Sequence, residues 1–142
     1  MDTPCSLCGA PPLNGKDCET IYNEFLVLEF TDPGYGEVHF LTVACYMTQH
    51  GRFSDEGLAW IKEKLRLHLE EGLSVAAIRD ENRDAVSNQN RAWKVTRPPE
   101  APPAPTVGWS MTIADVAKGY IDASTYRTLI TEWAKTTLAE MP

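Results

Sequence analysis

The sequence shows no long apolar run, no basic cluster and no charged segment followed by an apolar one at its start. Its longest apolar stretches are short and are interrupted by residues such as Glu29, His39 and Gln49, so we expect no membrane span. Without a charged segment followed by an apolar one at the N-terminus, we also expect no secretory signal and a cytoplasmic location. The net charge of −7 argues against general nucleic-acid binding, which needs a basic face to replace phosphate counterions.

The common catalytic signatures are missing as well. The sequence contains no His-Glu-x-x-His, no Gly-x-Ser-x-Gly and no glycine-rich phosphate loop. The zinc deaminase pattern fails because the Cys-x-x-Cys precedes the histidines instead of following a His-x-Glu. The sequence therefore favours a binding or interaction protein, with an unknown protein or small-molecule partner, over an enzyme.

The composition is that of a soluble globular protein. With 142 residues, 43% of them hydrophobic and 23% charged, the chain is long enough for one domain, residues 1–142, with a real core. In a reducing cytosol, the four cysteines are better explained as metal ligands or buried thiols than as disulfides.

Helical spacing of apolar residues dominates and predicts an all-α fold. Asp17 is placed to cap a first helix that ends near Phe30, and a dense turn signal follows over residues 31–36. Ser54 is a good N-cap for a later helix that Gly72 ends. The expected helices are 18–30, 38–50, 54–72, a weaker one over 74–84, a short one opened by a capping box at Thr112–Asp115, and a last one over 124–139.

Residues 87–110 are expected to form an extended connector, because their prolines forbid a regular helix or a central strand. Trp93 and Trp109 flank these prolines, which predicts that both ends of the connector pack back onto the helical body. The expected organisation is a zinc knuckle (1–18), a helical core (19–86), the connector (87–110) and C-terminal helices packed on the core (111–142).

A metal site is the strongest functional signal. Cys5 and Cys8 have the two-residue spacing that lets a knuckle turn aim both sulfurs at one ion, and Gly9 can take the positive φ that such a turn often needs. Cys18 falls at the first position of a helix capped by Asp17, where free N–H groups and the helix dipole stabilise a thiolate. We therefore expect three thiolate ligands to one Zn²⁺ ion.

Two histidines compete for the fourth position. One continuous helix separates His39 from His50 by about 16 Å at a rise of 1.5 Å per residue, so one ion can take only one of them. We favour His39, beside the turn after the first helix, and keep His50 as the alternative. Cys45 is better explained as a core thiol. Three further alternatives for the fourth position stay open: Cys45, a ligand from outside the chain, or no metal site at all. His68, on a charged stretch, is expected to be solvated.

Three roles fit such a site. A closed Cys3His site leaves no water to activate and is structural, the common case for thiolate-rich zinc. If the histidine is missing, an open position near Glu19, Asp32 or Glu37 would suit a zinc-dependent hydrolase. A thiol sensor that releases zinc on oxidation is the third. A simple Cys5–Cys8 redox pair has poor context, because the Gly-Ala-Pro-Pro that follows cannot begin a helix at the sulfur.

Tyr46 and His50 are also candidates for a polar pocket. With His39 and Val43 they repeat along one face of the second expected helix, and such a stripe could bind a small ligand. The simpler interpretation is that they satisfy buried hydrogen bonds where the proline-rich connector crosses.

The sequence resembles one family over nearly its whole length. The motifs that carry the likeness are Cys5-Ser-Leu-Cys8-Gly9, the segments 28–36 and 38–46 with Gln49-His50, and the ending 111–116 with Trp133-Ala134. They are similar to the small bacterial proteins grouped as the family of unknown function DUF5946. The resemblance implies a metal-binding helical protein with no established activity, and relatives that often carry Asp in place of Cys45 argue against that residue as a ligand.

Overall fold

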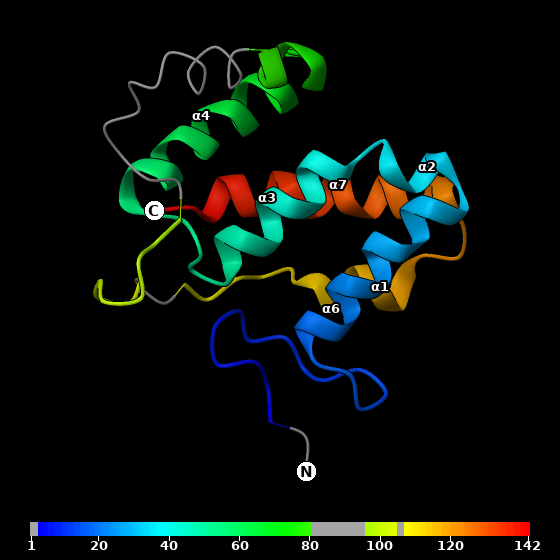
Figure 1. Ribbon diagram of the computed structural model, residues 1–142. Coiled ribbons are helices and arrows are strands. Elements are labelled where there is room, and N and C mark those ends of the chain that lie inside the picture. The colour runs from blue at the N-terminus through cyan, green and yellow to red at the C-terminus, as the bar shows by residue number, and fades with distance from the viewer. Residues whose placement is uncertain (1–2, 81–95, 105–106) are drawn as a thin grey trace.

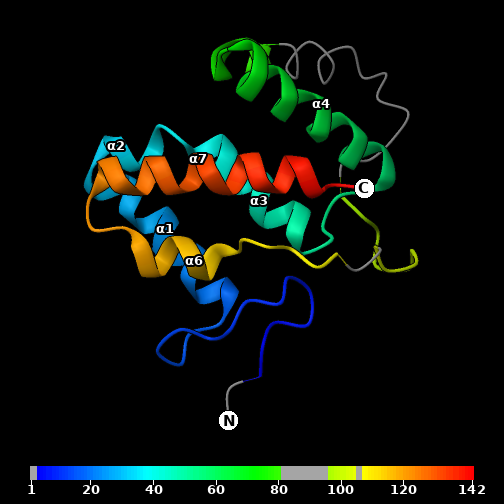
Figure 2. The same cartoon turned by 180° about the vertical axis from the view of Figure 1, so that it is seen from behind.

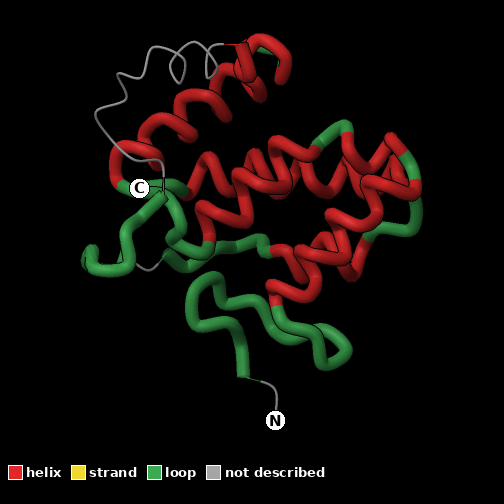
Figure 3. Tube along the Cα trace, in the orientation of Figure 1, coloured by secondary structure: helices red, strands yellow, loops and turns green. Residues whose placement is uncertain are grey.

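The computed structural model describes residues 3–80, 96–104 and 107–142, and the named elements within them are all helices (Figures 1 and 3). They are α1 (Cys18–Thr31), α2 (Pro33–Gly36), α3 (His39–Gln49), α4 (Asp55–Glu71), α6 (Ile113–Gly119) and α7 (Ala123–Glu140). Extended pairing in this part of the chain is limited to two isolated bridges, Leu13 with Lys16 and Phe53 with Thr96. The prediction of an all-α fold is confirmed.

The first helix begins where its cap predicts. The Asp17 carboxylate accepts a hydrogen bond from the backbone N–H of Thr20 at 2.9 Å, which satisfies one of the free donors of α1. Ile21 and Phe25, one turn apart, are buried in the core. The expected turn after α1 contains the short helix α2, because Asp32 caps it through the N–H of Gly34 and proline occupies its first position.

Helices α1 and α3 run in opposite directions on either side of α2 (Figure 1). Tyr22, near the start of α1, stacks on Tyr46, near the end of α3, with ring centroids 3.9 Å apart and planes 8° apart. The beginning of α1 therefore lies beside the end of α3.

Helix α7 packs along α3, and the two helices form the centre of the core (Figure 2). Trp133 of α7 is fully buried there. Gln49, at the end of α3, donates from its amide nitrogen to the backbone oxygen of Met111 at 2.9 Å and to the hydroxyl of Thr137 at 3.1 Å. These bonds join α3 to α7 and to the segment before α6.

Helix α4 has the ends that the sequence predicts. The Ser54 hydroxyl accepts from the N–H of Gly57 at 2.9 Å, and Gly72 takes the left-handed conformation with φ of 75°. The expected weaker helix is present over residues 75–80, and its remainder lies outside the described residues. His68 is not simply solvated, because its Nδ1 lies 2.7 Å from the carbonyl oxygen of Leu73 just past the helix end.

The described part of the connector, residues 96–104 and 107–110, is not helical and lies against the end of α3 and the start of α4. The Arg97 backbone N–H donates to the carbonyl of Arg52 at 2.8 Å, and its guanidinium pairs with Asp55 at 2.7 Å. Trp109 is partly buried against the core as expected, whereas Trp93 lies outside the described residues.

Helix α6 begins at the predicted capping box, and α7 begins at a cap, Asp122, that was not predicted. The Asp115 carboxylate accepts from the N–H of Thr112 at 2.8 Å at the start of α6, and the Asp122 carboxylate accepts from the N–H of Thr125 at 2.8 Å at the start of α7. Among the described residues, no helix combines the length and the apolar character needed to cross a bilayer.

Candidate metal centre

A tight turn at the N-terminus presents the first two cysteines. The N–H of Cys5 donates to the carbonyl of Ala10 at 2.8 Å, and the N–H of Gly9 donates to the carbonyl of Cys5 at 2.9 Å. Gly9 has φ of 82°, a conformation that a residue with a Cβ takes only at a cost. The turn therefore closes directly after Cys8, as the sequence predicts.

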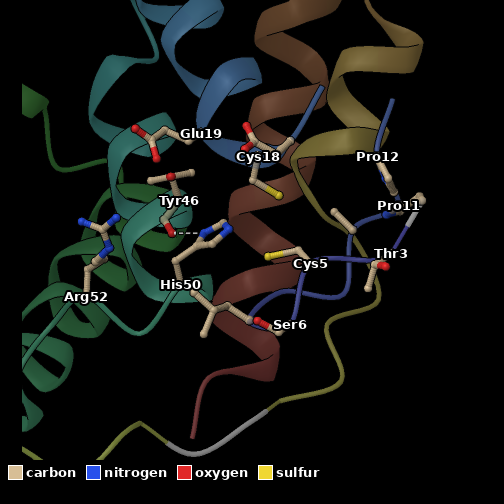
Figure 4. A pocket seen from close by; sticks show the side chains of 13 residues that line it. Thr3, Cys5, Ser6, Pro11, Pro12, Cys18, Glu19, Tyr46, His50 and Arg52 are labelled. Carbon is tan, nitrogen blue, oxygen red and sulfur yellow. Dashed lines mark hydrogen bonds between the residues drawn. The ribbon is translucent and has the colours of Figure 1, made fainter. Parts of the chain in front are cut away.

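The third cysteine comes from the first helix. Cys18 is the first residue of α1, directly after the cap Asp17, and its side chain points back toward the N-terminal turn (Figure 4). Its Sγ lies 3.5 Å from the Sγ of Cys8, and both residues are buried, with 8% and 3% of their surface exposed.

His50, at the end of α3, completes the cluster. One ligand atom from each of Cys5, Cys8, Cys18 and His50 can be chosen so that all four lie within 4.8 Å of one another. Figure 4 shows the imidazole and the sulfurs of Cys5 and Cys18 gathered at one point. Three separate stretches of the chain thus bring one nitrogen and three sulfurs together, because the antiparallel packing of α1 and α3 places their adjoining ends beside the turn.

A hydrogen bond to the protein backbone fixes the orientation of the His50 imidazole. His50 Nδ1 lies 2.7 Å from the carbonyl oxygen of Tyr46, so Nδ1 carries the proton and donates it (Figure 4). The other nitrogen, Nε2, then presents a lone pair, and it is buried without a hydrogen-bond partner. The Tyr46 ring packs 4.3 Å from the imidazole, centroid to centroid, and is itself covered by Tyr22. A buried, unprotonated nitrogen held by a backbone carbonyl is the usual preparation of a histidine metal ligand.

The charge balance of the cluster also favours a cation. The hydrogen bond from Cys18 lowers the pKa of Cys8, and a hydrogen bond from the backbone of Ala10 acts in the same direction against the effect of burial. The same hydrogen bond, followed by burial and the nearby Cys8 charge, raises the pKa of Cys18. A second thiolate is therefore disfavoured unless a positive ion lies among the sulfurs.

The structure does not bring His39 to this cluster, and the prediction of His39 as the fourth ligand gives way to the alternative, His50. Nearly half of the His39 side chain is exposed, and its Nδ1 pairs with the Glu29 carboxylate at 2.9 Å. His39 begins α3 and therefore lies at the end of the helix that is remote from Cys18. Two helices joined by a short turn pack antiparallel, so the end of the second helix lies beside the start of the first. The sequence therefore did contain a signal for His50, which stands at the end of the second expected helix.

The other candidates lie outside the cluster. Cys45 is fully buried in the core, where burial raises the pKa of its thiol to about 12, as expected of a core cysteine. Among the expected carboxylates, Glu37 pairs with Arg127 at 3.3 Å and Asp32 caps α2. Glu19 lies at the rim of an open pocket of about 310 Å³ beside the cluster.

That pocket adjoins three of the four candidate ligands. Cys5, Cys18 and His50 form part of its wall, and Tyr46 and Arg52 line it further out (Figure 4). Cys8 is not among the lining residues, so it faces the core while the other three face the pocket. Tyr46 and His50, the two candidates for a polar pocket, both line it, and His50 also makes a buried hydrogen bond to the Tyr46 carbonyl.

The fold and the cluster define an all-helical protein with a Cys3His group that could hold a metal ion. Residues 3–142 match the family of unknown function DUF5946, and the chain belongs to that family. No curated protein and no solved structure matches the chain significantly.

Proposed function

We propose that Cys5, Cys8, Cys18 and His50 bind one zinc ion in a closed structural site, and that the protein acts as a binding or interaction module. The observation that carries the proposal is the convergence of four nitrogen and sulfur donors within 4.8 Å around a buried Nε2 that has no other partner. A tetrahedral zinc with Zn–S bonds of about 2.3 Å places its sulfurs about 3.8 Å apart. The Cys8–Cys18 separation of 3.5 Å needs only a small adjustment to reach that value.

A structural role is supported by the positions of the ligands in the fold. The backbone hydrogen bonds of segment 3–16 join residues within that segment, so they do not attach it to α3. The ion would connect this segment to the start of α1 and the end of α3, and its binding energy would become folding energy. Four protein ligands also leave no open coordination position for a substrate or an activated water.

A zinc-dependent hydrolase is the competing function, and one observation favours it. The pocket beside the cluster contains Glu19 at its rim, a carboxylate that could serve as a general base if one ligand left the ion. The two functions differ in the coordination shell, because the structural site has three sulfurs and one nitrogen, whereas the hydrolase needs an oxygen ligand.

The decisive experiment measures metal content and coordination on protein purified without a histidine tag. Elemental analysis should give one zinc per chain, and X-ray absorption should give three sulfurs at about 2.3 Å and one nitrogen at about 2.0 Å. An oxygen ligand on the zinc would contradict the structural role and support the hydrolase. Absence of bound metal, together with no uptake of added zinc, would overturn both.

A pair of cysteine variants tests the site residue by residue. Cys8→Ser should remove the zinc and lower the free energy of unfolding by several kcal/mol, because structural zinc contributes on the order of 10 kcal/mol of binding energy. Cys45→Ser alters a buried thiol outside the cluster and should keep one zinc per chain. Equal zinc content in the two variants would contradict the assigned ligands.

A further inference from the structure

The three cysteines of the cluster differ in their access to solvent. Cys8 and Cys18 are buried, whereas Cys5 is partly exposed and lies in the N-terminal turn at the wall of the open pocket. Figure 4 shows its sulfur pointing toward the His50 ring. A small polar molecule that enters the pocket therefore meets Cys5 more readily than it meets Cys8.

Metal binding would keep this accessible sulfur in its reactive form. A zinc ligand is a thiolate, and thiolates, not thiols, attack peroxides. The pocket volume of about 310 Å³ is ample for hydrogen peroxide or a small organic hydroperoxide. Arg52 supplies a positive charge and hydrogen-bond donors among the lining residues, although Asp17 and Glu19 add negative charge there.

We propose that Cys5 is the site at which a peroxide oxidises the zinc centre, and that this oxidation releases the ion. The inference rests on the proposed zinc site and adds its chemical regulation. The geometry that carries it is one partly exposed sulfur, that of Cys5, with the sulfurs of two buried cysteines within 4.8 Å.

The reaction balances in two steps. In the first, the Cys5 thiolate attacks one peroxide oxygen, an S–O bond forms, the O–O bond breaks, and the leaving oxygen takes a proton as water or an alcohol. In the second, the thiolate of Cys8 or Cys18 attacks the Cys5 sulfur, an S–S bond forms, and hydroxide leaves and is protonated to water. The two cysteines lose two electrons and the peroxide gains them. Zinc loses two thiolate ligands and is released.

Release of the ion would remove the link that the metal makes between the N-terminal segment and α3, so the segment would be held only by the packing of side chains such as Ala10. His50 is the ligand that α3 contributes, and the backbone hydrogen bonds of residues 3–16 stay within that segment. Lys16, an exposed residue paired with Glu24 at 2.8 Å, follows the N-terminal turn and provides a tryptic site at which loosening can be detected.

The test uses the zinc-loaded full chain, hydrogen peroxide and a chromogenic zinc chelator. Peroxide should release zinc, and peptide mapping after alkylation should find Cys5 disulfide-bonded to Cys8 or Cys18 at early times, with Cys45 still reduced. Cleavage after Lys16 should accelerate in parallel. Oxidation that begins with a Cys8–Cys18 disulfide, or zinc release that leaves Cys5 reduced, would overturn the assignment.

A ligand-preserving variant separates oxidation from loss of the site. Cys5→His can still bind zinc but cannot be oxidised to a sulfenic acid, so its peroxide-dependent zinc release should fall on the order of tenfold. Release at the wild-type rate from zinc-loaded Cys5→His would overturn the proposal. If wild-type protein binds zinc through three sulfurs and one nitrogen but resists peroxide, this inference alone fails. If it binds no zinc, the proposed function fails with it.

Discussion

Tyr22 and Tyr46 stack face to face, 3.9 Å apart, and this contact aligns the start of α1 with the end of α3. The same alignment places Cys18 and His50, each four residues from one member of the pair, in a single cluster. The stacking of the two tyrosines and the grouping of the candidate ligands thus depend on the same packing of α1 against α3.

Replacing the ring of Tyr22 should therefore weaken zinc binding, although Tyr22 is not one of the candidate metal ligands. Tyr22→Ala removes a ring contact worth about 1 kcal/mol beyond its buried area, and it uncovers Tyr46, whose carbonyl holds His50. Zinc affinity, measured by competition with a chromophoric chelator, should fall several-fold. Tyr22→Phe keeps the ring and should bind zinc as the wild type does. Equal affinities for Tyr22→Ala and Tyr22→Phe would show that the stack does not position the histidine.

The two histidines of α3 provide a matched pair of variants. His50→Ala should lose zinc and unfold at a markedly lower temperature, because it removes a ligand from the buried cluster. His39→Ala removes only an exposed pair with Glu29, worth about 0.5 kcal/mol, and should keep one zinc per chain. Elemental analysis and thermal unfolding of both variants check this expectation. Zinc loss from His39→Ala with retention in His50→Ala would reverse the ligand assignment.

The positive φ of Gly9 gives a backbone test of the N-terminal turn. A Cβ at Gly9 would meet no atom within 4 Å, so Gly9→Ala acts only through the backbone conformation, at a cost of about 1 kcal/mol. Because this turn carries Cys5 and Cys8, zinc affinity should fall about fivefold to tenfold. Gly15→Ala is the control, since Gly15 also has positive φ and open space but lies outside the turn. Its substitution should lower stability and leave the affinity of the folded protein for zinc nearly unchanged.

Gln49 should be important for stability independently of any metal. Gln49→Leu removes the donor from the Met111 carbonyl and from the Thr137 hydroxyl and should cost about 2 kcal/mol in the free energy of unfolding. Thr137→Val removes the second of these bonds together with the hydrogen bond between the Thr137 hydroxyl and the Cys45 thiol, and should cost about 1 to 2 kcal/mol. Urea unfolding of the zinc-loaded proteins measures both. A neutral Gln49→Leu would mean that the two bonds contribute nothing to the α3–α7 interface.

The cap of α7 predicts that the stability of the folded protein depends on pH. The N–H and side chain of Thr125 lower the pKa of Asp122, so the folded state favours the carboxylate more than the unfolded state does. The stabilisation is present above the ordinary pKa of an aspartate, about 3.9, and is lost as the pH falls through the lower folded value. Asp122→Ala should lower the melting temperature at neutral pH, and its difference from wild type should shrink in acid. A difference that stays constant down to low pH would contradict the role of the carboxylate.

The helix ends were largely predictable because they depend on local chemistry. Asp17, Ser54 and Gly72 mark the ends of α1 and α4 through hydrogen bonds or backbone conformations within a few residues. The fourth member of the cluster depends on tertiary packing instead. His39 is nearer to the cysteines in sequence, but the antiparallel return of α3 brings His50 to them in space.

The polar contacts across the core were also beyond the reach of sequence patterns. Gln49 and Thr137 stand far apart in the chain, and no periodicity indicates that an amide would meet a hydroxyl there. Likewise, Arg97 in the connector could be identified as lying in an extended segment, but its pairing with Asp55 depends on where that segment crosses α4.

The spread of the cluster along the chain has a consequence for the order of folding. Cys5, Cys8 and Cys18 lie close together in the sequence, so an unfolded chain closes only small loops when these sulfurs meet an ion. His50 must return over a much longer loop, so at the proposed zinc site its nitrogen would reach the ion only after α1 and α3 have packed antiparallel. A newly made chain would therefore capture the metal loosely through sulfur first, and the late arrival of the imidazole would mark completion of the native helix packing.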